Sequence, residues 1–525
     1  MKKRIIISSI AVVLVAVIIA LTFAFCNNQN PDTDTSSKKP SSSKPVSTEP
    51  SDDEKDETSS DSSSNVSSLP TFNIGDINWD DYPESSGGDY EAEIPVFKIE
   101  DMLDGDETTY WSPYSTESSS VEFSLGKEAT FNTVEFIEHR TYITDYILEA
   151  KQSGQWVQIY RQDEMGDRVG VLDKTFTAKD FRLTVTMSDE RGGIAEIDFK
   201  LCDGFILPEE YANLGYHTAS RIDKVRANNF DELRGLTDVI LFDFASFDKD
   251  GNVVWDYLGG GYNEEFLVDM IEETEQALNG QKIRYWFGFQ YFTKRNPDVD
   301  TADVLATEES RVKLSDAMVE LCEKYGFYGI DIDYEYPHNK TQNPQKAWSN
   351  YDEFLKILGP KLHEKGYKLS LAMAPSSVRF SKETIELIDK VNVMSYDIVD
   401  NLGRHASYAL YDKCIVYFTD LGFDKSKLVM GMPFYTKTTT NDGGQAWYWV
   451  LNRWRGAIKP WVNWAYTNKY QFYFNGPYMV RDKVFYTMNN GLGGVFNWCM
   501  GSDVPDSEGR SLSLTVEETI KRFSK

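Results

Sequence analysis

The chain has 525 residues, of which 41% are hydrophobic and 14% aromatic. This apolar content excludes a wholly disordered protein, and at about 150 residues per domain the length suggests roughly three units. There are 54 Lys and Arg against 83 Asp and Glu, a formal net charge of −29. Such a chain repels polyphosphate, which argues against nucleic acid as a partner and suits neutral polymers such as polysaccharides.

Residues 1–26 predict a membrane segment. Lys2, Lys3 and Arg4 precede an apolar run that ends at Cys26. At about 1.5 Å per residue, a helix over residues 5–26 is long enough to cross a bilayer, and the basic residues keep its start in the cytoplasm. We therefore expect an uncleaved signal anchor in a single-pass protein of the cell membrane, with everything after it extracellular. Secretion after cleavage of a signal peptide is the alternative.

Residues 27–88 are rich in Ser, Thr, Pro and acidic residues and offer almost nothing to bury. They predict a disordered spacer that repels itself and extends. The five cysteines of the chain are scattered, show no zinc spacing and require no disulfide framework.

Residues 89–203 predict an all-β sandwich. Short runs of alternating polarity recur about every ten residues with turn residues between them. No helical pattern of comparable length interrupts them. The expected strands are 121–125, 133–137, 146–150, 156–160, 181–185 and 194–199.

This segment resembles the discoidin-like (coagulation-factor type C) domains, which include the family 32 carbohydrate-binding modules. The motifs that carry the resemblance are Asp104-Gly105-Asp106 with Thr109 and Trp111, the run 123–126 (FSLG), Trp156 and the run 194–197 (IAEI). The resemblance implies a jelly-roll sandwich that binds carbohydrate, with a structural calcium held by Asp104, Thr109 and Glu196. Hard oxygen donors of this kind suit Ca²⁺. A simple turn at the DGD motif, and a spacer role for the domain, are the alternatives.

Residues 204–525 predict a TIM (β/α)8 barrel, because eight strand-like segments alternate with helical patterns. The strands are expected at 214–217, 239–247, 282–289, 326–334, 368–374, 391–396, 428–435 and 492–498, and helices at 264–278, 308–325, 345–365 and 477–489. A doubly wound open sheet is the alternative, but no glycine-rich phosphate loop follows the first strand. In a barrel the chemistry lies at the carboxyl ends of the strands.

The fourth expected strand carries three carboxylates on one face. Asp331, Asp333 and Glu335 alternate with apolar or aromatic residues, so they point the same way, into the barrel. Mutual repulsion is expected to raise the pKa of at least one of them, and a carboxyl that stays protonated near neutral pH can act as a general acid. A metal site on the same three residues is the alternative.

The run 328–337 (YGIDIDYEYP) resembles the DxxDxDxE signature of glycoside hydrolase family 18, the chitinase family, with Tyr328 in place of the first acid. Further strand ends match the family in order: Met394-Ser395-Tyr396-Asp397 (MxYD), 431–435 (GMPFY) and 491–498 (GLGGVFNW). The resemblance implies substrate-assisted hydrolysis of a glycosidic bond, with no cofactor for catalysis.

The resemblance also implies a role for each residue. Glu335 protonates the glycosidic oxygen, Asp333 orients the substrate's acetamido group, and Asp331 shares a proton with Asp333. The hydroxyl of Tyr396 holds the acetamido oxygen. The remaining substrate-binding residues are Trp498, under the reacting sugar, and Met394, Asp397 and Tyr435.

We therefore predict an extracellular hydrolase of β-1,4-linked N-acetylglucosamine polymers such as chitin. The alternatives are an endo-β-N-acetylglucosaminidase acting on N-glycans or cell-wall glycan, and a chitinase-like lectin without activity. Residues 436–491 are too few for the small subdomain of deep-cleft chitinases, which predicts an open groove. The aromatic residues between 447 and 464 suit either a stacking platform for sugars or the core of a loop. We expect the barrel, from about Tyr211 onward, to act alone on short soluble substrates.

Overall fold

The computed structural model describes residues 98–525 except 114, 141, 190–191, 249–251, 291–303, 335–342, 376–377, 401, 441–442 and 455. The expected membrane segment, the spacer and Glu335 lie outside the described residues. Within the described part, no helix combines the length and the apolar character that a membrane span requires. The four cysteines in that part, Cys202, Cys322, Cys414 and Cys499, are free thiols.

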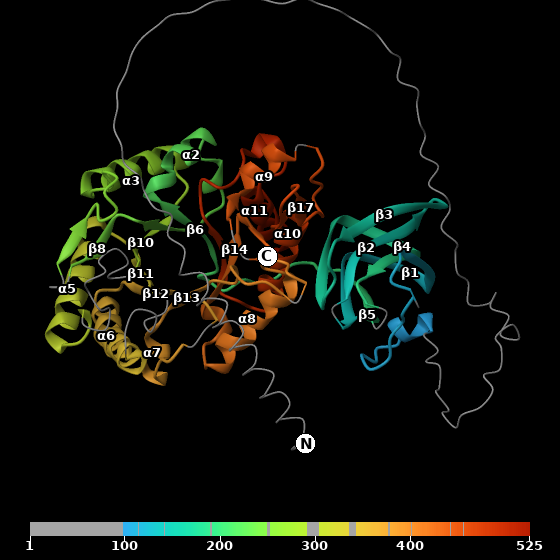
Figure 1. Cartoon of the computed structure of the whole chain (residues 1–525), viewed down its shortest axis with the longest axis horizontal. Helices are drawn as coiled ribbons and strands as arrows, with labels where there is room; N and C mark the ends of the chain where they lie inside the picture. Colours follow the sequence, from blue (N-terminus) through green and yellow to red (C-terminus); the bar gives the residue numbers. More distant parts are fainter. Residues whose placement is uncertain are drawn as a thin grey trace, which may run out of the picture. The chain divides into compact units, whose positions relative to one another are not determined.

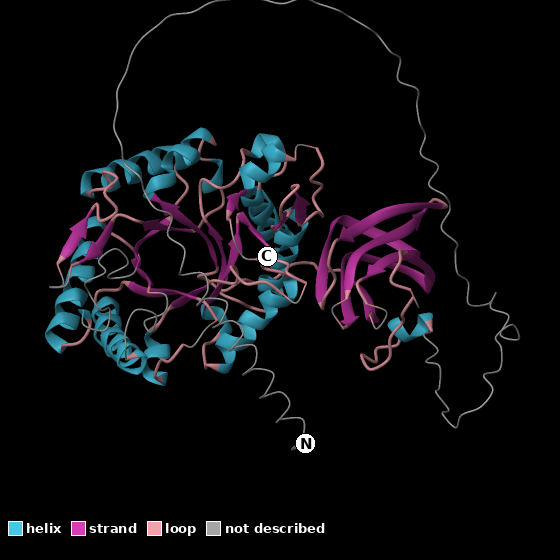
Figure 2. Ribbon diagram, viewed as in Figure 1, coloured by secondary structure: helices cyan, strands magenta, loops and turns pink. Residues whose placement is uncertain are grey.

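The first described domain is built almost wholly from antiparallel strands (Figure 2). After a short 3-10 helix, Ile99–Met102, its strands are β1 (Ser119–His139), β2 (Ile143–Gln152), β3 (Gln155–Gln162), β4 (Arg168–Met187) and β5 (Gly193–Lys200). They pair in the order β3-β2-β4-β1-β5. The expected runs 121–125 and 133–137 prove to be one strand, β1, whose pairing with β4 shifts register twice. Such bulges bend a strand, so β1 and β4 curve around a common core.

Alternate residues of these strands form that core. Phe131, Phe136, Tyr146 and Phe181 are completely buried. The ring of Phe181 also stacks on Phe199, with ring centroids 4.1 Å apart. Inward side chains at every second position are what the alternating pattern predicts for a half-buried strand.

The second domain is a closed barrel of eight parallel strands, as the sequence predicts (Figure 1). In chain order the strands are β6 (Ala212–Thr218), β7 (Asp238–Phe242), β10 (Arg284–Gln290), β11 (Gly329–Asp333), β12 (Lys368–Met373), β13 (Lys390–Val393), β14 (Leu428–Pro433) and β19 (Gly494–Trp498). One expected strand, 239–247, is divided: β7 ends at Phe242, and Asp243 follows at a φ of 74°. The remainder, β8 (Ala245–Phe247), pairs instead with β9 (Val253–Trp255).

Helices lie outside the ring of strands (Figure 1). They are α2 (Ile222–Ala227), α3 (Glu264–Leu278), α5 (Glu308–Tyr325), α6 (Pro344–Glu364), α7 (Lys382–Leu387), α8 (Tyr408–Asp420), α10 (Pro477–Asn489) and α11 (Leu512–Phe523). The predicted helices correspond to α3, α5, α6 and α10. Local sequence sets their ends: Asn263 and Thr307 cap the first turns of α3 and α5, and Gly326 ends α5 at a φ of 69°.

Between β14 and α10 the chain forms a small antiparallel sheet. It contains β15 (Tyr435–Thr438), β16 (Gln445–Ala446), β17 (Trp464–Tyr466) and β18 (Gln471–Tyr473), with helix α9 (Trp447–Arg453) beside it. The aromatic residues of this segment differ in their burial. Trp447 is buried in the core, whereas Trp464 is 36% exposed and Tyr466 56% exposed.

Candidate active site

Asp331 lies on β11 inside the barrel and is fully buried. Its Oδ2 accepts a hydrogen bond from the hydroxyl of Tyr216 at 2.9 Å, and its Oδ1 accepts one from Nδ2 of Asn392 at 3.0 Å. Burial raises the pKa of Asp331 to about 6, although hydrogen bonds from Ser370, Tyr216 and Asn392 act in the opposite direction. The predicted rise in pKa is thus confirmed, but its largest cause is burial rather than repulsion between carboxylates.

Asp333 ends β11 on the same face, two residues further on, and is only 4% exposed. The pKa of Tyr216 reflects the groups that lie near its hydroxyl. Burial and then the charges of Asp331 and Asp333, followed by Tyr396, raise its pKa well above the usual range. Two carboxyl groups and a second tyrosine therefore share one small space at the carboxyl end of the barrel.

Asp397 follows β13 with a φ of 58°, a left-handed conformation that aspartate tolerates better than most residues. Its Oδ1 accepts a hydrogen bond from the hydroxyl of Tyr435 at 2.6 Å and lies 3.3 Å from Nζ of Lys437. Its backbone N–H donates to Nε2 of His405 at 2.9 Å. Burial acts to raise the pKa of Asp397, but the charge of Lys437 and the hydrogen bond from Tyr435 lower it below its usual range. This carboxylate is therefore ionised throughout the neutral range.

Aromatic rings complete the site. Trp498 ends β19 and packs edge-on against Tyr216 and Phe242, with ring centroids 5.2 and 5.7 Å apart. The rings of Tyr396 and Tyr435 also meet edge to face, with centroids 6.0 Å apart. Met394, 8% exposed, belongs to the same cluster. All the predicted site residues of the barrel that the structure describes thus come together at one end of it.

Tyr328, in the first acidic position of the signature, lies at the opposite end of the barrel from this site. Its ring packs on Trp286, with centroids 5.2 Å apart, and its hydroxyl donates to Oε1 of Glu210 at 2.6 Å. Nearby, Arg284 forms two hydrogen bonds with Asp238, at 2.8 and 2.6 Å. Tyr328 therefore contributes to the packing and hydrogen bonding at the base of the barrel.

Sequence reasoning missed several residues of the site. Asn392 and Ser370 could have been recognised, since each is a polar residue between two apolar residues of a barrel strand, whereas Tyr216 stands next to the polar His217. A polar side chain in such a strand is expected to have a buried partner. No comparable sequence pattern marks His405 and Lys437, because both lie outside the barrel strands, in segments whose position cannot be inferred from alternating polarity.

The sequence-predicted calcium ligands of the sandwich also lie near one another. The hydroxyl of Thr109 donates to the carboxylate of Asp104 at 3.0 Å. Glu196 Oε1 is buried without a hydrogen-bond partner. Burial raises the pKa of Glu196 and Asp104 adds to the increase, although hydrogen bonds from the backbone N–H groups of Gly105 and Asp106 act in the opposite direction. Among the described residues no three His, Cys, Asp or Glu side chains gather as a metal site. Two carboxylates and a hydroxyl still form a set of hard donors that suits Ca²⁺ better than a softer metal.

Enzymes with a (β/α)8 barrel carry their chemistry at the carboxyl ends of the strands, which is where the aspartate pair and the aromatic rings of this protein lie. The model of the family described as glycosyl hydrolases family 18 matches residues 213–503, more than half of the chain. The protein therefore belongs to glycosyl hydrolases family 18. The model of the F5/8 type C domain matches residues 85–198, in agreement with the discoidin-like resemblance.

Curated relatives are distant. Endochitinase 1 of Metarhizium robertsii is 24% identical over 251 residues, which cover 38% of this chain and 58% of that protein. The endochitinase of Manduca sexta is 26% identical over 168 residues, covering 27% of this chain and 30% of the relative. The chain thus spans less than two thirds of the length of these relatives.

Among solved structures, catalytic domain 2 of the Group II chitinase of Ostrinia furnacalis superposes with a TM-score of 0.50 at 18% sequence identity. The match covers 60% of this chain and 97% of that domain. At this identity the likeness supports the barrel fold alone.

Proposed function

We propose that this protein hydrolyses β-1,4-linked N-acetylglucosamine polymers by substrate-assisted catalysis with retention of configuration. The observation that carries the proposal is the pair Asp331 and Asp333 on one strand face, with Asp331 buried at a pKa of about 6. An acid that titrates near neutral pH beside a second carboxyl can take up and return a proton during the reaction.

In the first step Glu335 gives its proton to the glycosidic oxygen, and the bond from that oxygen to the anomeric carbon breaks. The carbonyl oxygen of the sugar's own acetamido group bonds to the anomeric carbon, which forms an oxazolinium ion. Asp333 accepts a hydrogen bond from the acetamido N–H and offsets the positive charge. The hydroxyl of Tyr396 orients the acetamido oxygen. Glu335 lies outside the described residues, and its role is supported by its place two residues after Asp333.

In the second step water attacks the anomeric carbon from the side that the leaving group vacated. Glu335, now a carboxylate, takes the proton of that water, and the acetamido group is released. Two displacements at one carbon return the original configuration, so the product is the β-anomer. Asp397, held ionised by Lys437 and Tyr435, supplies a fixed negative charge at the edge of the pocket.

Three measurements test the proposal. Turnover of a fluorogenic N,N′-diacetylchitobioside is expected, and Glu335→Gln should lower kcat by at least about 10²-fold while sugar binding persists. Proton NMR of the first product should show the β-anomer. A chitobiose thiazoline should inhibit far more tightly than chitobiose, because it resembles the oxazolinium.

The alternatives give other results. Release of intact glycans from a glycoprotein, without cleavage of the chitobioside, would identify an endo-β-N-acetylglucosaminidase. Binding of chitooligosaccharides without any turnover would identify a lectin. A covalent glycosyl–carboxylate trapped on the enzyme would refute substrate assistance.

We also propose that residues 1–26 anchor the protein in the cell membrane, with residues 27–88 as an extracellular spacer. The basic start followed by a long apolar run supports this orientation. Externally added protease should release a barrel-containing fragment from intact cells. A fragment released only after cell lysis would show that the proposed orientation is wrong.

Finally, we propose that Asp104, Thr109 and Glu196 hold a structural calcium in the sandwich. The buried, unpaired oxygen of Glu196 supports this, because a cation would satisfy it. Calcium would there supply charge compensation between Asp104 and Glu196 and no catalytic step.

A further inference from the structure

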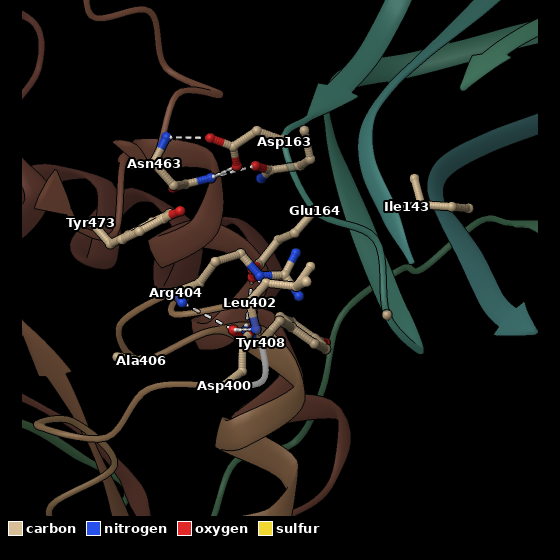
Figure 3. A network of polar contacts seen from close by, with 12 residues as sticks. Ile143, Asp163, Glu164, Asp400, Leu402, Arg404, Ala406, Tyr408, Asn463 and Tyr473 are labelled. Carbon is tan, nitrogen blue, oxygen red and sulfur yellow. Dashed lines mark hydrogen bonds and ion pairs between the residues drawn. The ribbon is translucent and has the colours of Figure 1, made fainter. Parts of the chain in front are cut away.

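A loop of the sandwich, residues 163–167, joins β3 to β4 and inserts carboxylates among residues of the barrel (Figure 3). Asp163 accepts two hydrogen bonds from Asn463, at 2.8 Å from the backbone N–H and at 2.6 Å from Nδ2. Glu164 is 4% exposed, and its Oε2 lies 3.2 Å from Nε of Arg404. The ion pair therefore joins the two domains away from solvent.

Glu164 also provides the N-terminal cap of a barrel helix. Helix α8 begins at Tyr408, and its N-cap residue, Ser407, makes no side-chain capping hydrogen bond. Instead the backbone N–H of Tyr408 donates to Oε1 of Glu164 at 2.9 Å. A carboxylate at this position satisfies an otherwise unpaired N–H and complements the positive end of the helix dipole.

The two contacts of Glu164, at Arg404 and Tyr408, lie on either side of residues 405–407. Arg404 also binds Asp400, with Nε 2.7 Å from Oδ2. On the other side of His405 the carbonyl oxygen of Ala406 accepts a hydrogen bond from Nζ of Lys483 at 2.7 Å. His405 lies between these two anchors and is only 1% exposed.

His405 connects this segment with the active site. Its Nε2 accepts the hydrogen bond from the backbone N–H of Asp397, and its ring packs against Tyr435, with ring centroids 5.5 Å apart. Tyr435 in turn donates to the carboxylate of Asp397. A displacement of residues 405–407 would therefore affect both the backbone of Asp397, through His405, and its side-chain partner Tyr435.

We propose that Glu164 of the sandwich is a positioning residue for the active site of the barrel: through Arg404 and the start of α8 it fixes His405, and through His405 it fixes Asp397 and Tyr435. The sandwich domain thus takes part in catalysis on every substrate, including short soluble ones. This inference rests on the proposed function for its kinetic arm and on structure alone for its second arm.

The kinetic arm compares Glu164→Gln and Glu164→Ala with Glu149→Gln in the full chain. Gln at position 164 can still accept the hydrogen bond from the backbone N–H of Tyr408 but has no charge to pair with Arg404. Ala can make neither contact. Glu149 is a matched control, because it pairs with Arg182 at 2.5 Å within the sandwich. With the soluble chitobioside we expect kcat/KM to fall about tenfold for Gln and further for Ala, since a group displaced by about 1 Å costs up to ~10²-fold. The control should match the wild type.

A double-mutant cycle separates positioning from general destabilisation. If Glu164 acts through Asp397, adding Glu164→Gln to an Asp397→Asn variant should lower kcat/KM by less than twofold. If the losses in kcat/KM from the two single substitutions simply multiply in the double variant, the proposal is wrong. A wild-type kcat/KM in Glu164→Ala would also overturn it.

The second arm is hydrogen exchange measured by mass spectrometry, which requires no activity. Peptides that cover 397–411 should exchange faster in Glu164→Ala than in the wild type or in Glu149→Gln, with peptides of α3 unchanged. Unchanged exchange at 397–411 would refute the proposed support. If the wild type cleaves no substrate but the exchange result holds, the proposed function fails and the structural inference stands.

Discussion

The hydroxyl of Tyr216 on β6 donates a 2.9 Å hydrogen bond to Asp331 on β11, so the first and fourth strands of the barrel are joined through its interior. Nδ2 of Asn392, on β13, lies 3.0 Å from both the hydroxyl of Tyr216 and Oδ1 of Asp331. Three strands thus converge on one buried carboxyl group. Its ionisation therefore depends on these donors.

Replacing Tyr216 with Phe should change the pH dependence of activity. The hydrogen bond from Tyr216 lowers the pKa of Asp331, so its loss should raise that pKa above about 6. The acidic limb of kcat/KM should then move to higher pH, measured from pH 4 to 8 on the chitobioside. Tyr211→Phe is the control, because it loses a buried hydrogen bond to Thr487 outside the site. An unchanged acidic limb would show that Asp331 does not govern it.

Replacing Trp498 with Ala should weaken the transition-state complex. The indole lies at the end of β19 on the aromatic cluster of Tyr216 and Phe242. Removal of an aromatic face of this size costs about 2 kcal/mol, roughly a 30-fold loss in kcat/KM. Trp498→Phe should retain part of the activity. Trp156→Ala, on the sandwich, should have no effect on the soluble substrate, and an equal loss there would indicate destabilisation rather than lost stacking.

Glu138 should make the protein less stable as the pH rises. Burial raises its pKa from 4.5 to about 7, although N–H groups of Ile143 and Gly166 donate to it. Between those two pKa values the folded state holds a proton that the unfolded state releases, so the free energy of unfolding decreases with increasing pH. The advantage of wild type over Glu138→Gln should therefore shrink from pH 5 to pH 8, by up to about 3 kcal/mol.

Urea denaturation at the two pH values measures this change. Glu122→Gln, at an exposed position of β1, is the control and should show the wild-type pH dependence. A constant difference between wild type and Glu138→Gln at both pH values would show that Glu138 has an ordinary pKa.

Removal of calcium should destabilise the sandwich. If the ion binds only the folded state, excess calcium adds a stabilisation that grows with its concentration over Kd, about 2.7 kcal/mol at 100 Kd. Scanning calorimetry of the whole chain should show a lower Tm in EGTA. Glu196→Gln should remove this dependence, whereas Asp198→Asn, on the same strand but exposed, should keep it. A calcium effect of equal size in both variants would refute the proposed ligands.

Much of the barrel follows from the sequence, because its strands and helices are determined by local periodicity. The buried residues of α3, Leu267, Met270, Thr274 and Leu278, recur every three to four positions, and the apolar pattern at 264–278 predicts a helix with the observed ends. In the same way, alternation along β11 predicts that Asp331 and Asp333 point inward together. The sequence pattern could not reveal that 121–125 and 133–137 form one strand, since the polar residues between them also suit a turn.

The contacts of Glu164 could not be predicted at all. Tyr408, which it caps, is 244 residues away in the chain. Glu164 lies in a loop next to two other acidic residues, a pattern that is typical of a solvated turn. Only the tertiary structure shows that the loop is buried against the barrel. The prediction of a freely separable barrel, made from the sequence, did not consider this interface.

The buried carboxylate of Asp482, on α10, has consequences for how the two domains can be inherited. Both of its oxygens accept hydrogen bonds from the sandwich: the hydroxyl of Tyr160 donates to Oδ2, and the backbone N–H of Val171 donates to Oδ1 at 2.9 Å. Arg168, likewise fully buried, lies 4.0 Å from it. A recombination event that moved the barrel without its sandwich would take Tyr160, Val171 and Arg168 away from Asp482 and would separate Arg168 from that carboxylate. Exchange of either domain for a homologue should therefore succeed only when the residues on both sides of this seam are exchanged together.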